Sequence, residues 1–341
     1  MSRVMVTGAS GFIGQFLCRR LVAEGHAVRG VFHQARPASV PAVPIEWVSV
    51  GHIGPDTHWQ AALAGADYVI HLAAIAHRVG KAHEVAADVY DVVNHRGTRR
   101  LAEAVAAHGQ IRRLVFVSSI GAVCRLSEAT IDERTPCMPS TLYGQSKFAA
   151  ELSVATALEG AAVDWCILRP SLVYGPGSPG NMARLLQLMR LPVPLPFGGL
   201  RNRRSFMYVE NLVDAIVLGL RHPKASRQTF CAADPDVLST PDLVRALGRA
   251  AGRPARIMWF PSWGLWLLGE FGEFVGRVTR RPLSINRDTV EKLCGSLPVD
   301  ASRFRRDCEW TPPFSMAEAL RATMASEAAQ ESWARATADR A

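Results

Sequence analysis

Gly8-Ala9-Ser10-Gly11-Phe12-Ile13-Gly14 is the stretch that decides the fold of this 341-residue chain. It follows the apolar run Val4-Met5-Val6 and opens a helical pattern from Phe12 to Ala23, after which a second apolar run extends from Ala27 to Phe32. This order predicts a strand, a tight turn, a helix and a second strand, which is the βαβ unit of a parallel sheet. A glycine triplet alone is a weak signal, because any tight turn favours glycine. Its position directly after the first strand indicates a loop whose backbone can approach a pyrophosphate at the N-terminus of the helix.

The same alternation of short apolar runs and helical patterns continues along the chain. It predicts strands at 45–50, 68–72, 114–117 and 165–168, and helices at 98–107, 146–157, 242–251 and 315–324. We therefore expect an α/β protein with a Rossmann-type doubly wound parallel sheet and a smaller, mostly helical C-terminal substrate domain. We assign residues 1–176 and about 205–235 to the dinucleotide-binding domain, 177–204 and 236–330 to the substrate domain, and 331–341 to a tail.

Composition narrows the class of protein and its compartment. The net charge of +9 is spread along the chain without a recognisable reading motif, so we expect no nucleic-acid partner and assign the charge to a cleft for anionic ligands. The seven cysteines are scattered and never spaced as C-x-x-C, which argues against disulfides and a metal site. The N-terminus lacks the apolar segment of a signal peptide, so we expect a cytoplasmic protein.

The end of the second predicted strand bears on the choice between NAD(H) and NADP(H). Rossmann domains specific for NAD place an acidic residue there to hold the ribose hydroxyls, and this chain has Phe32. His33 and Arg36 follow, and both are suited to a 2′-phosphate. We therefore favour NADP(H), with NAD(H) as the alternative if Arg36 is only a solvated loop residue.

Tyr143 and Lys147 are candidate catalytic residues. They are four residues apart, hence on one face of a predicted helix, where a lysine charge would lower the phenol pKa and let Tyr143 exchange a proton with a substrate oxygen. Ser118 and Ser119 end a predicted strand at the sheet edge where ligands of such folds bind, and we choose Ser119 as the hydrogen-bond donor to the reacting oxygen. Each pattern alone also fits an ordinary helix or turn.

Taken in order, these motifs resemble those of the extended short-chain dehydrogenases/reductases, the NAD-dependent epimerase/dehydratase family of sugar-nucleotide enzymes. The resemblance runs from about Val4 to Leu320. The residues that carry it are Thr7 to Gly14, Val69 to Ala74, Asn94 to Thr98, Ser118-Ser119, Tyr143 to Lys147 and Leu168 to Gly177.

The resemblance implies a role for each of these motifs. Ser119, Tyr143 and Lys147 would be the catalytic triad, with Asn94 supporting the hydrogen-bond network. The residues expected to bind the cofactor are Gly8, Ser10, Gly11, Phe12, Ile13, Gly14, Ile53, Leu72, Ala73, Ala74, Asn94, Tyr143, Lys147, Pro170 and Val173, besides His33 and Arg36. The family usually has Gly-Asp after its third strand to hold adenine, and this chain has Gly51-His52.

Substrate motifs resemble those that hold a UDP-sugar. Asn181 corresponds to an asparagine on the pyrophosphate, and Arg204, together with Ser119, is a candidate substrate-binding residue. Residues 194–198 would lie beside the base. The stretches Arg201 to Phe206 and Asn211 to Ala215 most resemble UDP-4-keto-6-deoxy-N-acetylhexosamine 4-reductases, with UDP-glucose or UDP-N-acetylglucosamine 4-epimerases as the alternative.

Two other functions stay as weaker alternatives. A non-catalytic dinucleotide-binding regulator would not need the intact Ser119, Tyr143 and Lys147 set. A reductase of hydrophobic hydroxy compounds at a membrane would explain the Trp-rich stretch 257–275, but not Arg204 and Asn181. That stretch is too short between charges to span a bilayer, so it predicts a packed helix, with peripheral membrane contact or an oligomer surface as alternatives. We also expect a homodimer.

Overall fold

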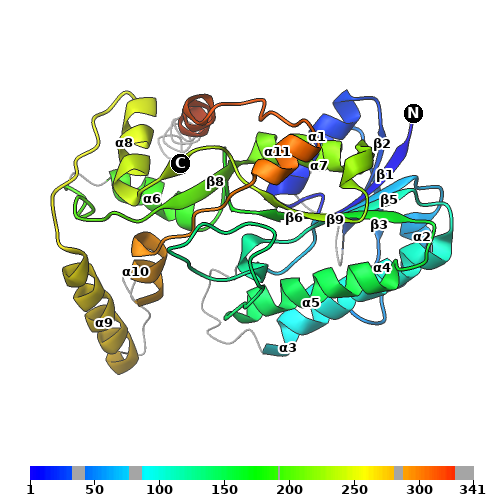
Figure 1. The fold of residues 1–341 in the computed structure, drawn as a ribbon, viewed down its shortest axis with the longest axis horizontal. Helices are drawn as coiled ribbons and strands as arrows, with labels where there is room; N and C mark the ends of the chain where they lie inside the picture. Colours follow the sequence, from blue (N-terminus) through cyan, green and yellow to red (C-terminus); the bar gives the residue numbers. More distant parts are fainter. Residues whose placement is uncertain (33–42, 77–86, 191–192, 280–286, 327–341) are drawn as a thin grey trace, which may run out of the picture.

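The computed structural model describes residues 1–32, 43–76, 87–190, 193–279 and 287–326. Its centre is a seven-stranded parallel sheet in the order β3-β2-β1-β4-β5-β6-β9 (Figure 1). The strands are β1 (Arg3–Thr7), β2 (Ala27–Phe32), β3 (Glu46–Ser49), β4 (Tyr68–His71), β5 (Arg113–Val117), β6 (Asp164–Pro170) and β9 (Gln228–Ala232). Because all seven run the same way, their carboxyl ends meet at one edge of the sheet.

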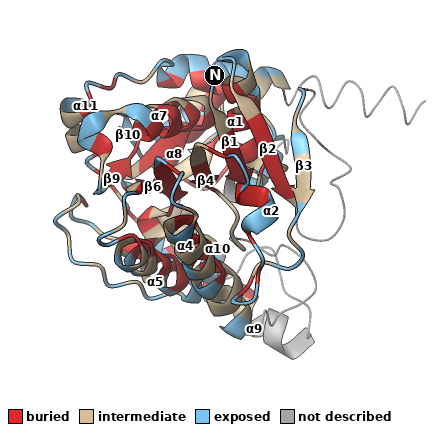
Figure 2. Ribbon diagram, turned by 90° about the vertical axis from the view of Figure 1, so that its right-hand side faces the viewer, coloured by how far each residue is buried: buried red, intermediate tan, exposed pale blue. Residues whose placement is uncertain are grey.

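Helices cover both faces of this sheet, as the alternating pattern predicts. In Figure 1, α1 (Phe12–Ala23), α7 (Val209–Arg221) and α11 (Ser302–Asp307) lie above it, and α4 (Gly97–His108) and α5 (Leu142–Ala157) lie below. Two separate buried clusters fill the spaces between helices and sheet, and Figure 2 shows the inner strands of the sheet mostly buried and β3 at its edge more exposed. The expected doubly wound Rossmann-type fold is confirmed.

Short helical segments complete this part of the chain. They are α2 (Gln60–Leu63), α3 (Ala87–Tyr90), a π-helix η1 (Asp91–Arg96), and two 3₁₀ turns, η2 (Ile120–Ala122) and η3 (Pro223–Ala225). α3 and η1 lead directly into α4.

The part of the chain at the left of Figure 1 is mostly helical, as expected, but it also contains a small sheet that the sequence analysis missed. Its helices are α6 (Asn181–Arg190), α8 (Thr240–Ala250), α9 (Ser262–Thr279), α10 (Arg287–Cys294) and a helix over 316–326. Its strands, in the order β10-β8-β7, are β7 (Leu172–Tyr174), β8 (Arg204–Tyr208) and β10 (Val237–Leu238). A third buried cluster fills the space between these helices and the small sheet.

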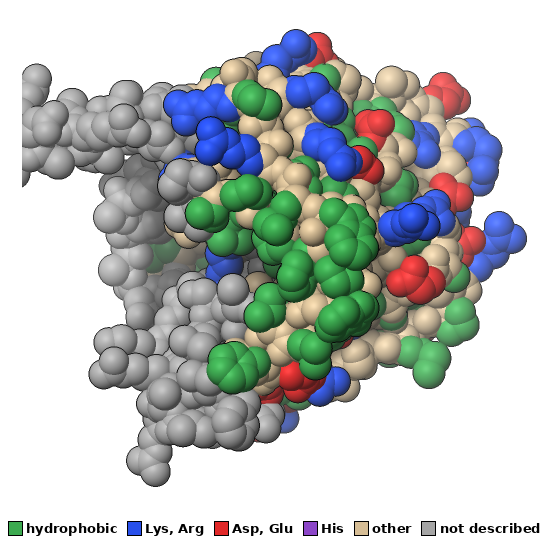
Figure 3. Space-filling view, turned by 90° about the vertical axis from the view of Figure 1, so that its left-hand side faces the viewer, with side chains coloured by type: hydrophobic (Ala, Val, Ile, Leu, Met, Phe, Trp, Pro, Cys, Tyr) green, Lys and Arg blue, Asp and Glu red, His purple; other side chains and the backbone are tan. Residues whose placement is uncertain are grey.

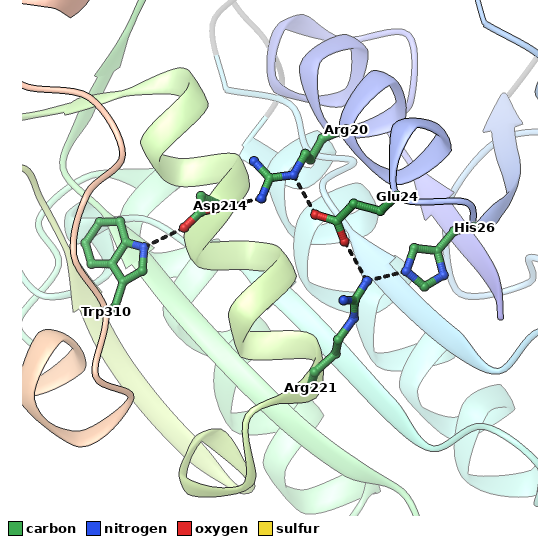
Figure 4. Close-up of polar contacts among 6 residues, drawn as sticks. All are labelled: Arg20, Glu24, His26, Asp214, Arg221 and Trp310. Carbon is green, nitrogen blue, oxygen red and sulfur yellow. Dashed lines mark hydrogen bonds and ion pairs between the residues drawn. The ribbon is translucent and has the colours of Figure 1, made fainter. Parts of the chain in front are cut away.

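A network of polar contacts joins the two helices that cover the upper face of the sheet. Figure 4 shows its six members: Arg20, Glu24, His26, Asp214, Arg221 and Trp310. Asp214 of α7 accepts from Arg20 of α1 at 2.8 Å and from the indole of Trp310 at 2.9 Å. The network therefore joins the helix that follows the glycine loop to the helix that follows β8 and to the C-terminal segment.

The glycine loop is closely packed, which explains why it needs glycines. Gly8 has a φ of +68°, and a Cβ on it would lie 2.9 Å from the amide nitrogen of Ala73. A Cβ on Gly14 would lie 2.1 Å from the carbonyl oxygen of Gly8. That separation is far below van der Waals contact, so the first turn of α1 can approach the loop only if residue 14 has no side chain.

We expect Gly14→Ala to lower the free energy of unfolding by about 2 kcal/mol or more, because the added methyl must push α1 away from the loop. Gly54→Ala is the matched control, since a Cβ there would meet only a Val92 methyl at 3.5 Å, and we expect it to change stability by less than about 1 kcal/mol. Urea unfolding measures both. Equal effects would show that packing at Gly14 does not shape the loop.

Candidate active site

Ser119 and Tyr143 lie together at the carboxyl edge of the sheet. Ser118 and Ser119 come directly after β5. Ser119 caps η2, where its Oγ accepts a hydrogen bond from the amide of Gly121 at 3.1 Å. Tyr143 is in the first turn of α5, whose N-cap Thr141 accepts from the amide of Gly144 at 3.0 Å. The side chains of Tyr143 and Ser119 are hydrogen-bonded to each other.

Gly144 is what allows the two catalytic candidates to approach. A Cβ on Gly144 would lie 2.3 Å from the carbonyl oxygen of Gly121. The first turn of α5 therefore rests on the backbone of η2, and Tyr143 reaches the hydroxyl of Ser119 because the next residue has no side chain.

Lys147 lies one turn further along α5 and is buried. Its Nζ donates to the carbonyl of Val117 at 2.7 Å and lies 4.2 Å from the centre of the Phe116 ring. Burial lowers the pKa of this amine to about 7, although the charge of Glu151 opposes the shift. Near neutral pH the side chain therefore exists in both charged and neutral forms.

The pKa of Tyr143 differs from the expectation. We expected the charge of Lys147 to lower this pKa. Instead, removal of the phenol from water raises its pKa, and the hydrogen bond with Ser119 offsets only part of that increase. The Nζ of Lys147 is directed at the carbonyl of Val117 instead. The phenol is therefore protonated at neutral pH, the form that can donate a proton to a carbonyl oxygen.

Asn94 supports the site through the catalytic helix. It is buried in η1, accepts from the amide of Ile75 at 2.8 Å, and donates to the carbonyl of Ile75 at 3.0 Å and to the hydroxyl of Ser146 at 3.1 Å. Ser146 in turn donates to the carbonyl of Tyr143 at 2.8 Å. Asn94 thus fixes the first turn of α5 relative to the segment after β4. A π-helix often occurs at functional sites, and periodicity gave no sign of this one.

A buried polar chain that the sequence analysis missed extends from Asn94 to the glycine loop. Thr98 donates to the carbonyl of Asn94 at 2.6 Å and bonds to Nε2 of His71 at 2.8 Å. The Nδ1 of His71 bonds to Thr7 at 2.6 Å, and Thr7 also accepts from the amide of Ala73 at 3.1 Å. Burial, and then the charge of Lys147, lowers the pKa of His71 to about 3. The imidazole is therefore neutral and has a structural role.

A second missed feature is the buried ion pair of Glu151 and Arg169. Their closest atoms are 2.6 Å apart, and the guanidinium donates through both Nε and Nη2. The pair joins α5 to the end of β6. Glu151 lies four residues after Lys147 on α5, and Arg169 is near the end of β6. The signal in the sequence was the arginine in an otherwise apolar strand, because a buried arginine needs a partner.

The residues expected to bind the cofactor are arranged along the same edge, and the cradle fits a dinucleotide. Gly8, Gly11 and Gly14 form the turn at the N-terminus of α1, in contact with Ala73 after β4. Pro170 ends β6 and Val173 lies in β7. Among the described residues, the buried hydroxyls of Ser118 and Ser171 have no hydrogen-bond partner, which is what a polar ligand at this edge would satisfy. Ser10 lies in the glycine loop, and Phe12 and Ile13 are in the first turn of α1. Leu72 and Ala74 are in the segment that follows β4.

Ile53 borders an open hollow of about 390 Å³ after β3, together with Val50, Pro55 and Val92. This position fits the adenine end of a dinucleotide. His33 and Arg36, on which the preference for NADP(H) rests, lie outside the described residues.

The structure describes only some of the side chains that we expect to bind the substrate. Arg204 begins β8, and its Nε donates to the carbonyl of Gly295 at the end of α10, at 2.8 Å. Burial lowers its pKa. Asn181 is the first residue of α6, and its side chain is not described. The loop over 194–198 is joined to residues 256–258, with the amide of Gly198 donating to the carbonyl of Met258 at 3.0 Å.

Residues 4–232 match the NAD dependent epimerase/dehydratase family. The chain belongs to this family. It is therefore an NAD(P)-dependent enzyme of the short-chain dehydrogenase/reductase kind.

The sequence similarity to individual members of this family extends over nearly the whole chain. A UDP-glucose 4-epimerase of Vibrio cholerae is 31% identical, with 94% of each chain covered. An N-acetyl-alpha-D-glucosaminyl-diphospho-ditrans,octacis-undecaprenol 4-epimerase of Escherichia coli O157:H7 is 26% identical, again with 94% of each covered. The structure of UDP-glucuronic acid 4-epimerase from Bacillus cereus in complex with NAD has a TM-score of 0.73 at 22% identity, with 96% of this chain and 99% of that one covered.

Tyr143→Phe should lower kcat by about 10²- to 10⁴-fold, because it removes the hydroxyl that we expect to give the proton to the substrate oxygen. Cofactor affinity should change by less than about threefold, because the ring and Lys147 stay in place. Tyr68→Phe, which removes a phenol from β4 away from this edge, is the control. Steady-state kinetics and a fluorescence titration measure the two effects. Full activity in Tyr143→Phe would exclude Tyr143 as the acid.

Lys147→Met should stabilise the cofactor-free protein at pH 6, by about 5 °C in Tm, because it removes a buried amine whose charged form is disfavoured. Between pH 7 and 10.5 the unfolded chain binds more protons at Lys147 than the folded chain, so the wild-type protein gains stability as the pH rises. The difference from the variant should therefore shrink toward pH 10.

Thermal unfolding from pH 6 to 10 measures this trend, with the exposed Lys224→Met as the control. A Tm difference that does not change with pH would show that the Lys147 amine is not destabilised by burial.

Proposed function

We propose that this protein transfers hydride at C4 of a UDP-linked sugar, and that it acts as an NADPH-dependent reductase of a UDP-4-keto-6-deoxy-N-acetylhexosamine. The observation that carries the proposal is the hydrogen-bonded Ser119 and Tyr143 pair with Lys147 buried beneath it, at the edge of the sheet where the glycine loop lies. The full-length similarity to 4-epimerases supports chemistry at C4.

In the reductase reaction, the residues of this chain act on the oxygen at C4. Ser119 donates a hydrogen bond to the ketone oxygen, and Tyr143 gives it a proton. Lys147, buried beneath the pair, would hold the cofactor ribose, and the proton on Tyr143 would be replaced from solvent. The cofactor supplies hydride to the carbon, so ketone, NADPH and one proton become alcohol and NADP⁺. The protonated state of Tyr143 at neutral pH favours this direction.

A UDP-sugar 4-epimerase is the second candidate, favoured by the 31% identity to a UDP-glucose 4-epimerase. The same three residues would first remove a proton from the C4 hydroxyl and then return it after the sugar turns in the pocket. That reaction keeps its cofactor through the cycle, whereas a reductase must release NADP⁺ at each turnover. Tight cofactor retention therefore separates the two candidates.

We also propose the arrangement that goes with this function. Residues 177–204 and 236–330 form the substrate domain, where Arg204 and Asn181 contact the UDP diphosphate. Lys147, Tyr143, Asn94 and the glycine loop bind the dinucleotide. We propose that the protein works in the cytoplasm as a homodimer, and the exposed Leu142 and Leu152 of α5 support a helical dimer surface.

The test is to denature the purified protein, identify any released dinucleotide by mass, and titrate the emptied protein with NADPH and NADH. We expect an empty site and at least a tenfold preference for NADPH, about 1.4 kcal/mol. Arg36→Ala should reduce that preference without changing the affinity for NADH. Stoichiometric NAD⁺ in the purified protein would overturn the reductase and select the epimerase.

A further inference from the structure

One face of the substrate domain carries a group of large apolar side chains in solvent. We call it the Trp surface, and its members are Met258, Trp259, Trp263, Trp266, Leu267, Leu268 and Phe271. Trp259 is 73% exposed and Trp263 is 66% exposed. Figure 3 shows apolar side chains gathered on this side of the molecule. Most exposed apolar residues of a soluble protein occur singly, and a continuous patch indicates a binding surface.

The orientation of α9 explains why these large side chains are exposed. Apart from Leu265, which is buried, the inward side is formed by glycines: a Cβ on Gly264 would lie 2.6 Å from the Phe260 ring, and one on Gly269 would lie 2.9 Å from Val290 of α10. The large residues, including Trp263 and Leu267, face outward. A surface helix normally has the opposite arrangement, with its large apolar side chains in the core.

The charge around the Trp surface is strongly positive. Charged residues occur along the whole chain, but the excess of positive charge is less even than we expected: residues 245–287 contain eight arginines and two glutamates, and no lysine or aspartate, so most of the net charge of +9 lies in this stretch. One of the glutamates, Glu270, lies 3.5 Å from Arg287. Figure 3 shows Lys and Arg side chains along the upper border of the apolar patch. An apolar patch bordered by arginines is complementary to a layer of anionic headgroups over acyl chains.

The geometry also limits how the helix can meet a bilayer. Within the described residues, no helix is long and apolar enough to cross a membrane. Thirteen residues, 257–269, separate Arg256 from Glu270 without a charge. Tryptophan favours the interface between headgroups and acyl chains. A helix of this kind lies in the plane of the interface.

The Trp surface is directly connected to the loop that we expect beside the substrate base. The amide of Leu195 donates to the carbonyl of Arg256 at 2.8 Å, and the amide of Met258 donates to the carbonyl of Leu195 at 3.0 Å. A Cβ on Gly199 would lie 2.2 Å from the carbonyl oxygen of Phe260, so the two segments are in close contact. Whatever binds the Trp surface therefore lies against the substrate domain.

We propose that the Trp surface docks this enzyme on an anionic phospholipid bilayer, with α9 lying in the interface and the exposed Arg253, Arg256 and Arg287 on the headgroups. This goes beyond the proposed reaction and does not depend on which sugar is used. The docked enzyme has its substrate domain against the membrane, and its sheet edge stays open to a dinucleotide from solution.

The experiment is co-sedimentation of the full chain with vesicles of phosphatidylcholine alone and with about 30% phosphatidylglycerol, combined with Trp fluorescence. We expect binding to the anionic vesicles, a blue shift on binding, and weakening by 0.5 M NaCl. Trp263→Ser/Leu267→Ser should reduce the bound-to-free ratio about tenfold or more. Met138→Ser, outside the Trp surface and outside α5, is the control, because Met138 is 76% exposed and Leu267 60%.

Circular dichroism, cofactor titration and light scattering are run on the same variants. An unchanged fold and cofactor affinity in the double variant, with lost vesicle binding, supports the proposal, and this result is independent of the sugar chemistry. Equal vesicle binding by the double variant and the wild-type protein overturns it. Absence of vesicle binding, with an oligomer that the double variant dissociates, also overturns it and assigns the Trp surface to a second copy of the chain.

Discussion

The parallel register of β1, β4, β5 and β6 is the constraint on which the site depends. Thr7 pairs with His71, His71 with Phe116, and Phe116 with Ile167, so the loops that follow these strands start at the same height. The glycine loop, the Ala73 segment and Ser119 therefore meet at one edge without long connections. A shift of one strand by a single residue would turn its side chains to the opposite face and separate these groups.

The polar groups beneath this edge are costly to bury, and the structure offsets the cost by pairing them. His71 is bonded at both ring nitrogens, Asn94 makes three hydrogen bonds, and Arg169 has a carboxylate partner. Lys147 differs, because within the described part of the chain its amine has a single hydrogen bond, to the Val117 carbonyl, and its pKa falls to about 7. A buried amine with one hydrogen bond and a strongly lowered pKa is typical of a residue retained for function.

The sequence predicted the first helix and second strand with their observed bounds, because glycines separate clear periodic patterns there. It placed the start of α5 late, at 146 instead of Leu142, because Thr141 caps the helix before its apolar residues begin. It missed β7, β8 and β10, which are two to five residues long and form a small sheet of their own. The contacts of His71 and Arg169 were also beyond prediction, since their partners come from distant segments.

Hydropathy alone could not decide the orientation of α9. The stretch 257–275 has enough tryptophan and leucine for a core helix, and a packed helix was the first expectation. In the structure α9 packs on the protein through Leu265 and its glycine side, with Gly264 and Gly269 inward, and leaves Trp263 exposed. The glycines were the available signal, because a helix with glycine on one side and large apolar residues on the other can approach its own protein closely only on the glycine side. The apolar side is then left for a different partner, and the excess of arginines around it indicates a negatively charged one.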